Sequence, residues 1–283
     1  MAGGVSKAVP LELNRATGKW ELDFEKYEKA ITPKTRLLLI NTPHNPTGKV
    51  FTLDELNQIS YILNKYTHVT AVTDEVYEKL VYDNKQHIRL ASLPGMWERT
   101  LTISSSGKTF SATGWKIGWV YGAEHLVKPI VLANQWIQYC VSTPAQWAIA
   151  KVLKESNNPY EGYPSYYEYV RQQYQRKRDS LVESLRDGHF EPYVPEGGFF
   201  IMADTSKYDP TEEYMKQPGL DGLPVTRDWA FARWLTVERG ITPIPPSAFY
   251  TPETKHLAAN LGKFNFNFIY NGSNVRNSTL CFL

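Results

Sequence analysis

Short apolar runs alternate with stretches of helical periodicity through the first 157 residues of the chain. Four runs are too short for helices and therefore predict β-strands at 36–41, 69–73, 100–104 and 117–122. Between the first two runs, apolar residues recur every three or four positions and predict an amphipathic helix whose apolar face is formed by Leu53, Leu56, Ile59 and Ile62. Strands that alternate with helices predict an α/β fold with a mainly parallel sheet flanked by helices.

Residue patterns typical of helix ends support this division. Thr52 with Glu55 three residues later is a capping-box pattern, so a helix is expected to begin there. Thr143 followed by Pro144 predicts a second helix start, because proline is favoured in the first turn.

The composition changes near residue 157, where an Asn-Asn-Pro sequence is followed by a long helical stretch rich in Tyr, Gln and Arg that ends at about Gly188. A strand is then predicted at 199–204 and a helix at 228–238, with Gly240 just past its end. We therefore predict a large domain at 1–157 and a smaller α+β domain at 158–283 that includes the connecting helix. Both domains are expected to be incomplete.

Composition excludes several classes of function. The chain has 31 basic and 29 acidic residues and a net charge of +2, so it has no electrostatic footprint for nucleic acid or a membrane surface. No run approaches the roughly 20 apolar residues of a membrane span. The two cysteines form no CxxC pair, and His44 and His87 lack metal-ligand spacing, so no metal site is expected and both histidines are predicted to be structural or solvent-facing.

Polar clusters stand at or beside the end of each predicted strand. They occupy residues 41–48, 73–77, 104–110 and 113–119. Ligands bind at the carboxyl edge of open α/β sheets, so these clusters predict a binding site there.

The clusters contain the residue types that a pyridoxal phosphate site needs. Such a site requires a lysine to form an imine, a carboxylate for the pyridine nitrogen, donors for the phenolic oxygen, and hydroxyls with a cation for the phosphate. In that order, the candidates are Lys108, then Asp74, then Tyr77 with Asn45, then Ser105 with Lys116.

Each candidate also has an ordinary structural interpretation. Asp74 is equally placed to cap a helix after a strand, and Lys108 to be a solvated loop lysine. The serines at 104–106 with Gly107 are typical of a flexible turn. A nucleoside-triphosphate loop is disfavoured, because its pattern requires glycine where Thr102 stands.

Four segments together resemble fold-type-I aminotransferases of class I/II, and in particular the kynurenine aminotransferases, also called glutamine transaminase K or cysteine-S-conjugate β-lyase. They are NTPHNPTGKVF, TDEVYEKLVYD, LPGMWERTLTISSSGKTFSATGWKIGWV and PEGGFFIMAD. The resemblance runs from about residue 1 to about residue 261 and is most specific at 41–122. It implies the fold of pyridoxal-phosphate-dependent transferases of type I, with a smaller α+β C-terminal domain.

The resemblance also implies roles for individual residues. Lys108 would form the Schiff base with pyridoxal 5'-phosphate and carry a proton to and from the substrate Cα. Asp74 would pair with the pyridinium, and Tyr77 and Asn45 would bond the phenolic oxygen. Asn45 would also contact the substrate carboxylate, and Ser105 and Lys116 would hold the phosphate.

The implied activity is a ping-pong exchange of amino groups between kynurenine- or glutamine-type amino acids and 2-oxo acids. Elimination from the substrate Cβ would be a side reaction. The complete enzyme would be a homodimer that binds these small substrates. It would act in the cytoplasm or alternatively in mitochondria.

The sequence departs from the family pattern at both ends. The family's N-terminal segment, with its glycine-rich phosphate turn, is not recognisable, and neither is the final arginine that binds the α-carboxylate in a bidentate manner. Arg276 is one candidate for that arginine. Lys263 lies nearer the expected place, but a lysine cannot reproduce the guanidinium fork. We therefore expect this chain alone to bind the cofactor poorly. The alternatives are a truncated, non-catalytic isoform and another class I/II enzyme of the aspartate or alanine type.

Overall fold

The computed structural model describes residues 3–219, 222 and 224–265. The chain divides into two compact units. The first, which we call the sheet unit, comprises Asp23–Gln173 and Glu196–Gly198. The second, the hairpin unit, comprises Met1–Leu22, Tyr174–Pro195 and Phe199–Leu283. The boundaries of these units differ from those of the predicted domains, 1–157 and 158–283. The two domains remain a prediction.

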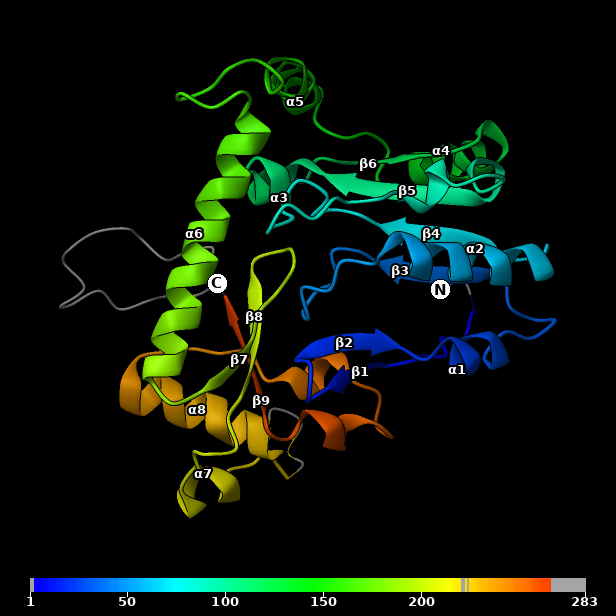
Figure 1. Ribbon diagram of the computed structural model, residues 1–283. Coiled ribbons are helices and arrows are strands. Elements are labelled where there is room, and N and C mark those ends of the chain that lie inside the picture. The colour runs from blue at the N-terminus through cyan, green and yellow to red at the C-terminus, as the bar shows by residue number, and fades with distance from the viewer. Residues whose placement is uncertain (1–2, 220–221, 223, 266–283) are drawn as a thin grey trace. The chain divides into compact units, whose positions relative to one another are not determined.

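The sheet unit is built on four strands that run side by side (Figure 1). They are β3 (Leu37–Asn41), β4 (Thr70–Asp74), β5 (Thr100–Ser105) and β6 (Gly118–Tyr121), in that spatial order. The pairings β3–β4 and β4–β5 are parallel, whereas β6 runs antiparallel to β5. All four predicted strands and the predicted α/β class are thus confirmed, with a sheet that is mixed at its β6 edge.

Five helices belong wholly to the sheet unit. They are α1 (Phe24–Lys29), α2 (Leu53–Lys65), α3 (Ser106–Thr109), α4 (Glu124–Ile137) and α5 (Thr143–Glu155), and short 3-10 turns lie at Leu90–Ser92, Trp97–Arg99 and Thr113–Trp115. The predicted capping box is present: Thr52 Oγ1 accepts from the Glu55 amide, and the Glu55 carboxylate accepts from the Thr52 amide. The helix starts predicted at Thr52 and Thr143 are therefore confirmed.

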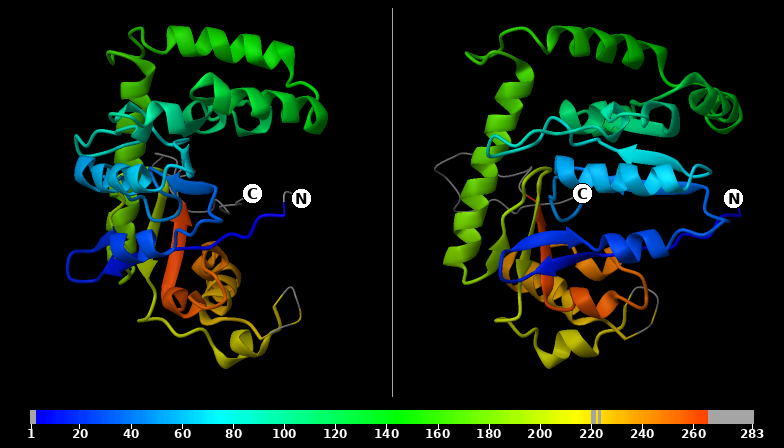
Figure 2. Two further views of the ribbon diagram at one scale, coloured as in Figure 1. Left: turned by 90° about the vertical axis from the view of Figure 1, so that its right-hand side faces the viewer. Right: turned by 45° about the vertical axis from the view of Figure 1, so that its right-hand side comes forward.

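The two faces of this sheet differ in burial. On one face Leu38, Ile40, Ala71 and Thr73 are buried, and α2 runs alongside β3 and β4 in every view (Figure 2). On the other face Leu37 and Leu39 are 63% and 69% exposed. Successive residues of a strand point to opposite faces, so Asn41 and Asp74, at the carboxyl ends of β3 and β4, share the open face.

The hairpin unit contains an antiparallel sheet in the order β7 (Glu191–Tyr193), β8 (Phe200–Asp204) and β9 (Leu261–Asn265). The hairpin of β1 (Leu11–Asn14) and β2 (Lys19–Leu22) contributes Trp20 to a core cluster with Tyr193, Met202 and Leu261. Helices α7 (Glu212–Lys216) and α8 (Arg227–Arg239) and 3-10 turns at Pro246–Phe249 and Lys255–Ala258 complete the unit.

Four predictions for this region are confirmed. A strand covers most of 199–204, the helix predicted at 228–238 is α8, and Gly240 ends it in the left-handed conformation with φ of 69°. Helix α6 (Tyr166–Asp187) is the predicted long helix, and its residues are divided between the two units at Gln173. Within the described residues, no helix has the length and apolar character that crossing a membrane requires.

Candidate active site

The four polar clusters meet at one edge of the β3–β6 sheet. Asn41 pairs with Asp74 across the parallel ends of β3 and β4, and Asp74 pairs with Ile103 of β5. Because β6 is antiparallel, its first residue, Gly118, lies beside the last residue of β5, Ser105. The loop that carries Lys116 into β6 therefore arrives at the same edge as the carboxyl ends of the other three strands.

Lys108 lies close to two of the other predicted residues. Its Nζ is 5.9 Å from the centroid of the Tyr77 ring, and its charge interacts with the Asp74 carboxylate. Burial raises the pKa of Asp74, while the Val76 amide and the positive charge of Lys108 oppose that shift. The structure thus groups an amine, a carboxylate and a phenol, although their roles toward a ligand remain predictions.

The carboxylate of Asp74 also stabilises its own loop. Its Oδ1 accepts a hydrogen bond from the Val76 amide at 3.3 Å. A side-chain bond to the amide two residues later is typical of a turn. Asp74 therefore caps a turn and not the start of a helix, which was its alternative interpretation.

Tyr77 sits in that turn with only 3% of its surface exposed. Hydrogen bonds from the Glu78 amide to the Glu75 carbonyl and from the Leu80 amide to the Tyr77 carbonyl define the turn. Gly198 packs against the Tyr77 ring, since a Cβ at Gly198 would lie 4.0 Å from Tyr77 Cγ. The ring is therefore fixed by packing on a defined backbone.

Asn41 is a positioning residue that the sequence analysis did not single out. Its Nδ2 donates to the Asp74 carbonyl at 2.9 Å, and its Oδ1 accepts from the Asn45 amide at 2.6 Å. One side chain thus joins the loop that bears Asn45 to the strand that bears Asp74. The signal that could have revealed it is a polar residue at the end of an otherwise apolar strand.

Lys108 is carried by the short helix α3, whose geometry depends on its neighbours. Ser105 Oγ accepts from the Gly107 amide at 3.1 Å, so Ser105 caps this helix. Thr113 Oγ1 donates to the Gly107 carbonyl at 3.1 Å, and a Cβ at Gly107 would lie 3.0 Å from Thr113 Cα. A side chain at 107 would press against the backbone at Thr113, so glycine favours the close approach of the loop before β6 to the lysine-bearing helix.

The remaining candidates differ in placement. Lys116 has an exposed side chain and a left-handed backbone with φ of 58°. Arg276 lies outside the described residues. Lys263, the alternative for the carboxylate-binding cation, is buried in the hairpin unit, where its Nζ is 3.6 Å from the Phe200 ring centroid and 4.4 Å from that of Phe249.

The two histidines have structural contacts. His44 Nδ1 lies 2.8 Å from Thr47 Oγ1 within the loop after β3. His87 Nε2 lies 2.7 Å from Glu75 Oε2 in a buried position. Both contacts fit the structural alternative that the sequence left open.

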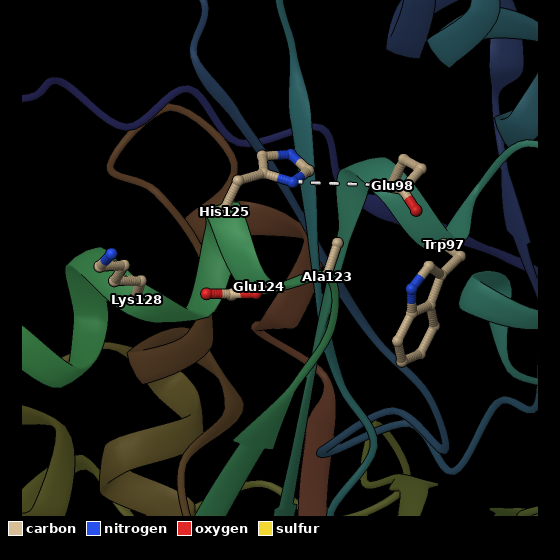
Figure 3. A pocket seen from close by; sticks show the side chains of 6 residues that line it. All are labelled: Trp97, Glu98, Ala123, Glu124, His125 and Lys128. Carbon is tan, nitrogen blue, oxygen red and sulfur yellow. Dashed lines mark ion pairs between the residues drawn. The ribbon is translucent and has the colours of Figure 1, made fainter.

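A hollow of about 500 Å³ lies at the other end of the sheet, before β5 begins and after β6 ends (Figure 3). Its lining residues are Trp97, Glu98, Ala123, Glu124, His125 and Lys128. His125 Nδ1 pairs with Glu98 Oε2 at 3.7 Å. None of the predicted site residues lines it, so we do not assign the chemistry to this hollow.

The chain matches a family model and several known proteins. The family model for aminotransferase class I and II matches residues 2–261. A kynurenine–oxoglutarate transaminase of Dictyostelium discoideum is 39% identical over 94% of this chain and 63% of its own length. Kynurenine–oxoglutarate transaminase 3 of Homo sapiens is 38% identical over 94% of this chain and 58% of its own length.

A solved structure agrees with these matches. N-succinyldiaminopimelate aminotransferase from Mycobacterium tuberculosis superposes with a TM-score of 0.75 at 34% identity, over 88% of this chain and 58% of that one. This chain therefore spans less than two thirds of the length of each relative described.

Proposed function

Because the chain belongs to the class I and II aminotransferase family, we propose that it carries the cofactor-binding edge of a pyridoxal-phosphate-dependent aminotransferase. The observation that supports this most directly is the grouping of Lys108 with Tyr77 and Asp74 at the end of parallel strands. The proposed reaction moves the amino group of kynurenine- or glutamine-type amino acids to a 2-oxo acid. Kynurenine and the 2-oxo acid rest on the names of the relatives that are 38–39% identical, and glutamine-type donors rest on the resemblance of the sequence motifs.

The residues at the edge fit pyridoxal 5'-phosphate. Asp74 would pair with the pyridine nitrogen, because a carboxylate there stabilises the protonated ring. Tyr77 and Asn45 would hold the phenolic oxygen, and Ser105 and Lys116 the phosphate. The bound cofactor would act as an electron sink for negative charge that develops at the substrate Cα.

Lys108 has two tasks in this proposal. Its amine would hold the cofactor covalently through the aldehyde, with loss of water. When not bonded to the cofactor, the same amine would act as a base that takes the proton from the substrate Cα and as the acid that returns it. The cap at Ser105 and the close approach at Gly107 support this task, since both fix the short helix that carries Lys108.

The substrate would be bound through its carboxylate. We propose Asn45 as one contact, since Asn41 fixes its loop by the 2.6 Å bond to the Asn45 amide. Arg276 stays a prediction. With a leaving group on Cβ, loss of the Cα proton would instead expel that group, which is the proposed β-lyase side reaction.

We further propose that the complete enzyme is a homodimer. Apolar side chains on and between α4 and α5 support it, because Trp136, Ile137, Tyr139 and Trp147 are 76–90% exposed. Such side chains mark surfaces that an assembly or further chain covers. Sedimentation of two proteins, the chain alone and the chain preceded by the relatives' N-terminal segment, tests whether a dimer forms.

Covalent trapping tests the central assignment. The purified chain is incubated with pyridoxal phosphate, reduced with borohydride and digested, and the phosphopyridoxyl group is located by mass spectrometry. We expect the label on Lys108, its loss in Lys108→Arg, and its retention in Lys65→Arg, a surface lysine of the same unit. A label that persists in Lys108→Arg would refute the assignment.

Activity needs a second comparison, because the chain is shorter than its relatives. Kynurenine, glutamine, aspartate and alanine are assayed with 2-oxoglutarate, for this chain and for a version preceded by the relatives' N-terminal segment. We expect weak cofactor retention by the chain alone and kynurenine turnover by the extended version. Turnover of aspartate or alanine in its place would support the other class I/II activities, and no turnover by the extended version would support a non-catalytic isoform.

A further inference from the structure

A buried polar network lies on the sheet face opposite the proposed site. Glu75 directly follows Asp74, so its side chain continues the buried face of β4 formed by Ala71 and Thr73. The Glu75 side chain has no exposed surface. His87 Nε2 lies 2.7 Å from its Oε2, and Arg89 Nε lies 3.7 Å from the same oxygen.

Glu78, at the far end of the turn that holds Tyr77, joins the same network. Arg89 NH2 pairs with Glu78 Oε2, and Ser104 Oγ of β5 donates to Glu78 Oε1 at 3.3 Å. The charge of Arg89 also interacts with Tyr121 of β6. One guanidinium therefore pairs with carboxylates at both ends of the turn and interacts electrostatically with a phenol of the sheet.

The charge states of these groups favour the pairing of Arg89 with the two glutamates. Burial lowers the pKa of Arg89, but the charge of Glu78, the interaction with Tyr121 and the charge of Glu75 outweigh it, so the pKa is raised. Burial raises the pKa of Tyr121, so the phenol stays neutral. Buried carboxylates cost free energy unless they are paired. Without Arg89, Glu75 would keep its contact with His87 and Glu78 its 4.0 Å pairing with Lys79, but each carboxylate would lose the guanidinium that joins the two ends of the turn.

Geometry shows what this pairing constrains. The Glu75 amide donates to the Ile103 carbonyl of β5 at 2.9 Å, and the Glu78 amide donates to the Glu75 carbonyl at 2.9 Å. Asp74 lies immediately before these bonds, and Tyr77 lies between the two glutamates. A turn whose ends are both tied to Arg89 has little freedom to change how it presents these side chains.

We propose that Arg89, assisted by His87, is a positioning residue: through Glu75 and Glu78 it fixes the turn that presents Asp74 and Tyr77 at the opposite face. The part that concerns a ligand rests on the proposed function. The part that concerns the turn does not, because it depends only on contacts within the sheet unit.

Hydrogen exchange of the chain without cofactor tests the turn. Arg89→Met keeps much of the side-chain length but removes the charge, and we expect amide exchange at 75–80 to rise about tenfold. Arg99→Met is the matched control, because Arg99 is a second partly buried arginine of the same unit that donates to the carbonyls of Leu63, Tyr66 and Val69. It should raise exchange near 63–69 and leave 75–80 unchanged.

Two further variants keep this test decisive. Arg89→Lys retains the charge and should restore part of the protection at 75–80. If Arg89→Met unfolds, Glu78→Gln replaces it, because that change loosens one end of the turn while the bond between Ser104 and residue 78 can persist. Wild-type exchange at 75–80 in every folded variant would overturn the proposal.

A cofactor readout separates positioning from simple stability. In the extended version loaded with pyridoxal phosphate, Arg89→Met should lower the visible circular dichroism of the bound cofactor and reduce kcat about tenfold. The KM of the 2-oxo acid should change less than twofold, and Arg89→Lys should recover part of both losses. Faster exchange with unchanged dichroism and kcat would refute the positioning role. If the wild-type protein binds no cofactor, the proposed function fails, while hydrogen exchange still decides whether Arg89 fixes the turn.

Discussion

Lys108 Nζ lies 5.9 Å from the centroid of the Tyr77 ring, although the two residues follow different strands. Tyr77 belongs to the turn after β4, and Lys108 to the helix after β5. The parallel pairing of these strands brings their carboxyl ends together. The approach of amine and ring therefore follows from the parallel pairing of β4 and β5.

Two substitutions at Tyr77 separate packing from chemistry. Tyr77→Phe keeps the buried ring, so we expect the free energy of unfolding to change by about 1 kcal/mol or less, while affinity for pyridoxal phosphate falls. Tyr77→Ala removes a ring that is 3% exposed and should cost about 3–5 kcal/mol. Urea unfolding and cofactor titration measure the two effects, and unchanged affinity in Tyr77→Phe would contradict the proposed contact with the phenolic oxygen.

The segment Glu196–Gly198 packs between two loops of the site. The amides of Glu196 and Gly197 both donate to the Gly48 carbonyl, and the Gly198 amide donates to the Leu80 carbonyl. A Cβ at Gly197 would lie 2.7 Å from the Leu80 carbonyl oxygen and 2.8 Å from Pro43 Cβ. These contacts leave no space for a side chain at this position.

Gly197→Ala is therefore expected to destabilise the protein by about 1–3 kcal/mol, because backbone and a rigid proline ring must shift. Gly114→Ala is the control, since no atom lies within 4 Å of its added Cβ. Thermal or urea unfolding of both variants measures the difference. Equal stability of the two would show that the loops around 43 and 80 adapt freely.

The start of α2 allows a third prediction. Thr52→Ala removes one half of the capping box and should cost about 1 kcal/mol. Glu55→Ala removes the other half and also the 2.6 Å ion pair with Lys49, whose side chain is 9% exposed, so we expect a cost of about 3 kcal/mol. Adding Lys49→Met to Glu55→Ala should recover part of that loss in urea unfolding. A double variant that shows no recovery would mean that the ion pair contributes little.

The strands could be predicted because their apolar residues occur in short runs, and the helices because periodicity coincided with capping residues such as Thr52 and Gly240. The direction of β6 could not, since an apolar run reads the same for parallel and antiparallel pairing. Yet that direction brings Lys116 to the site edge.

The buried network was missed for a related reason. Glu75 follows the end of a strand, whereas His87 and Arg89 come after the next loop. Taken alone, each is an ordinary polar residue. The available signal was the alternation Ala71, Thr73, Glu75, which places a carboxylate on the buried face. A charge at such a position requires a partner, but only the fold identifies which one.

A fourth prediction concerns acid stability in the hairpin unit. Burial would raise the pKa of Asp204, but hydrogen bonds from Ser206 and the 2.7 Å pairing with Arg15 outweigh it, so the pKa is lowered from 3.8. A lowered pKa contributes stability above pH 3.8 that is lost as the pH falls through the folded-state value. Asp204→Asn should therefore be less stable than wild type at pH 7, by about 2 kcal/mol, with a smaller difference below pH 3.8. Urea unfolding at several pH values tests this, and a difference independent of pH would contradict it.

The pKa of Asp74 is shifted in the opposite direction to that of Asp204. Its pKa is raised from 3.8 chiefly by burial, with the Val76 amide and Lys108 opposing, so the folded protein binds the proton more tightly than the unfolded chain does. Stability must therefore fall as the pH rises from 3.8 through the folded-state value, and it stays lower at pH 7. Asp74→Asn removes the buried charge and should be more stable than wild type at pH 7, with the gap closing below pH 3.8. The same variant should lose affinity for pyridoxal phosphate, because an amide cannot balance the charge of a protonated pyridine. If Asp74→Asn is more stable than wild type and binds the cofactor more weakly, the Asp74 carboxylate destabilises the fold and is required for binding. If Asp74→Asn is instead less stable at pH 7, the carboxylate stabilises the fold, which would contradict the prediction.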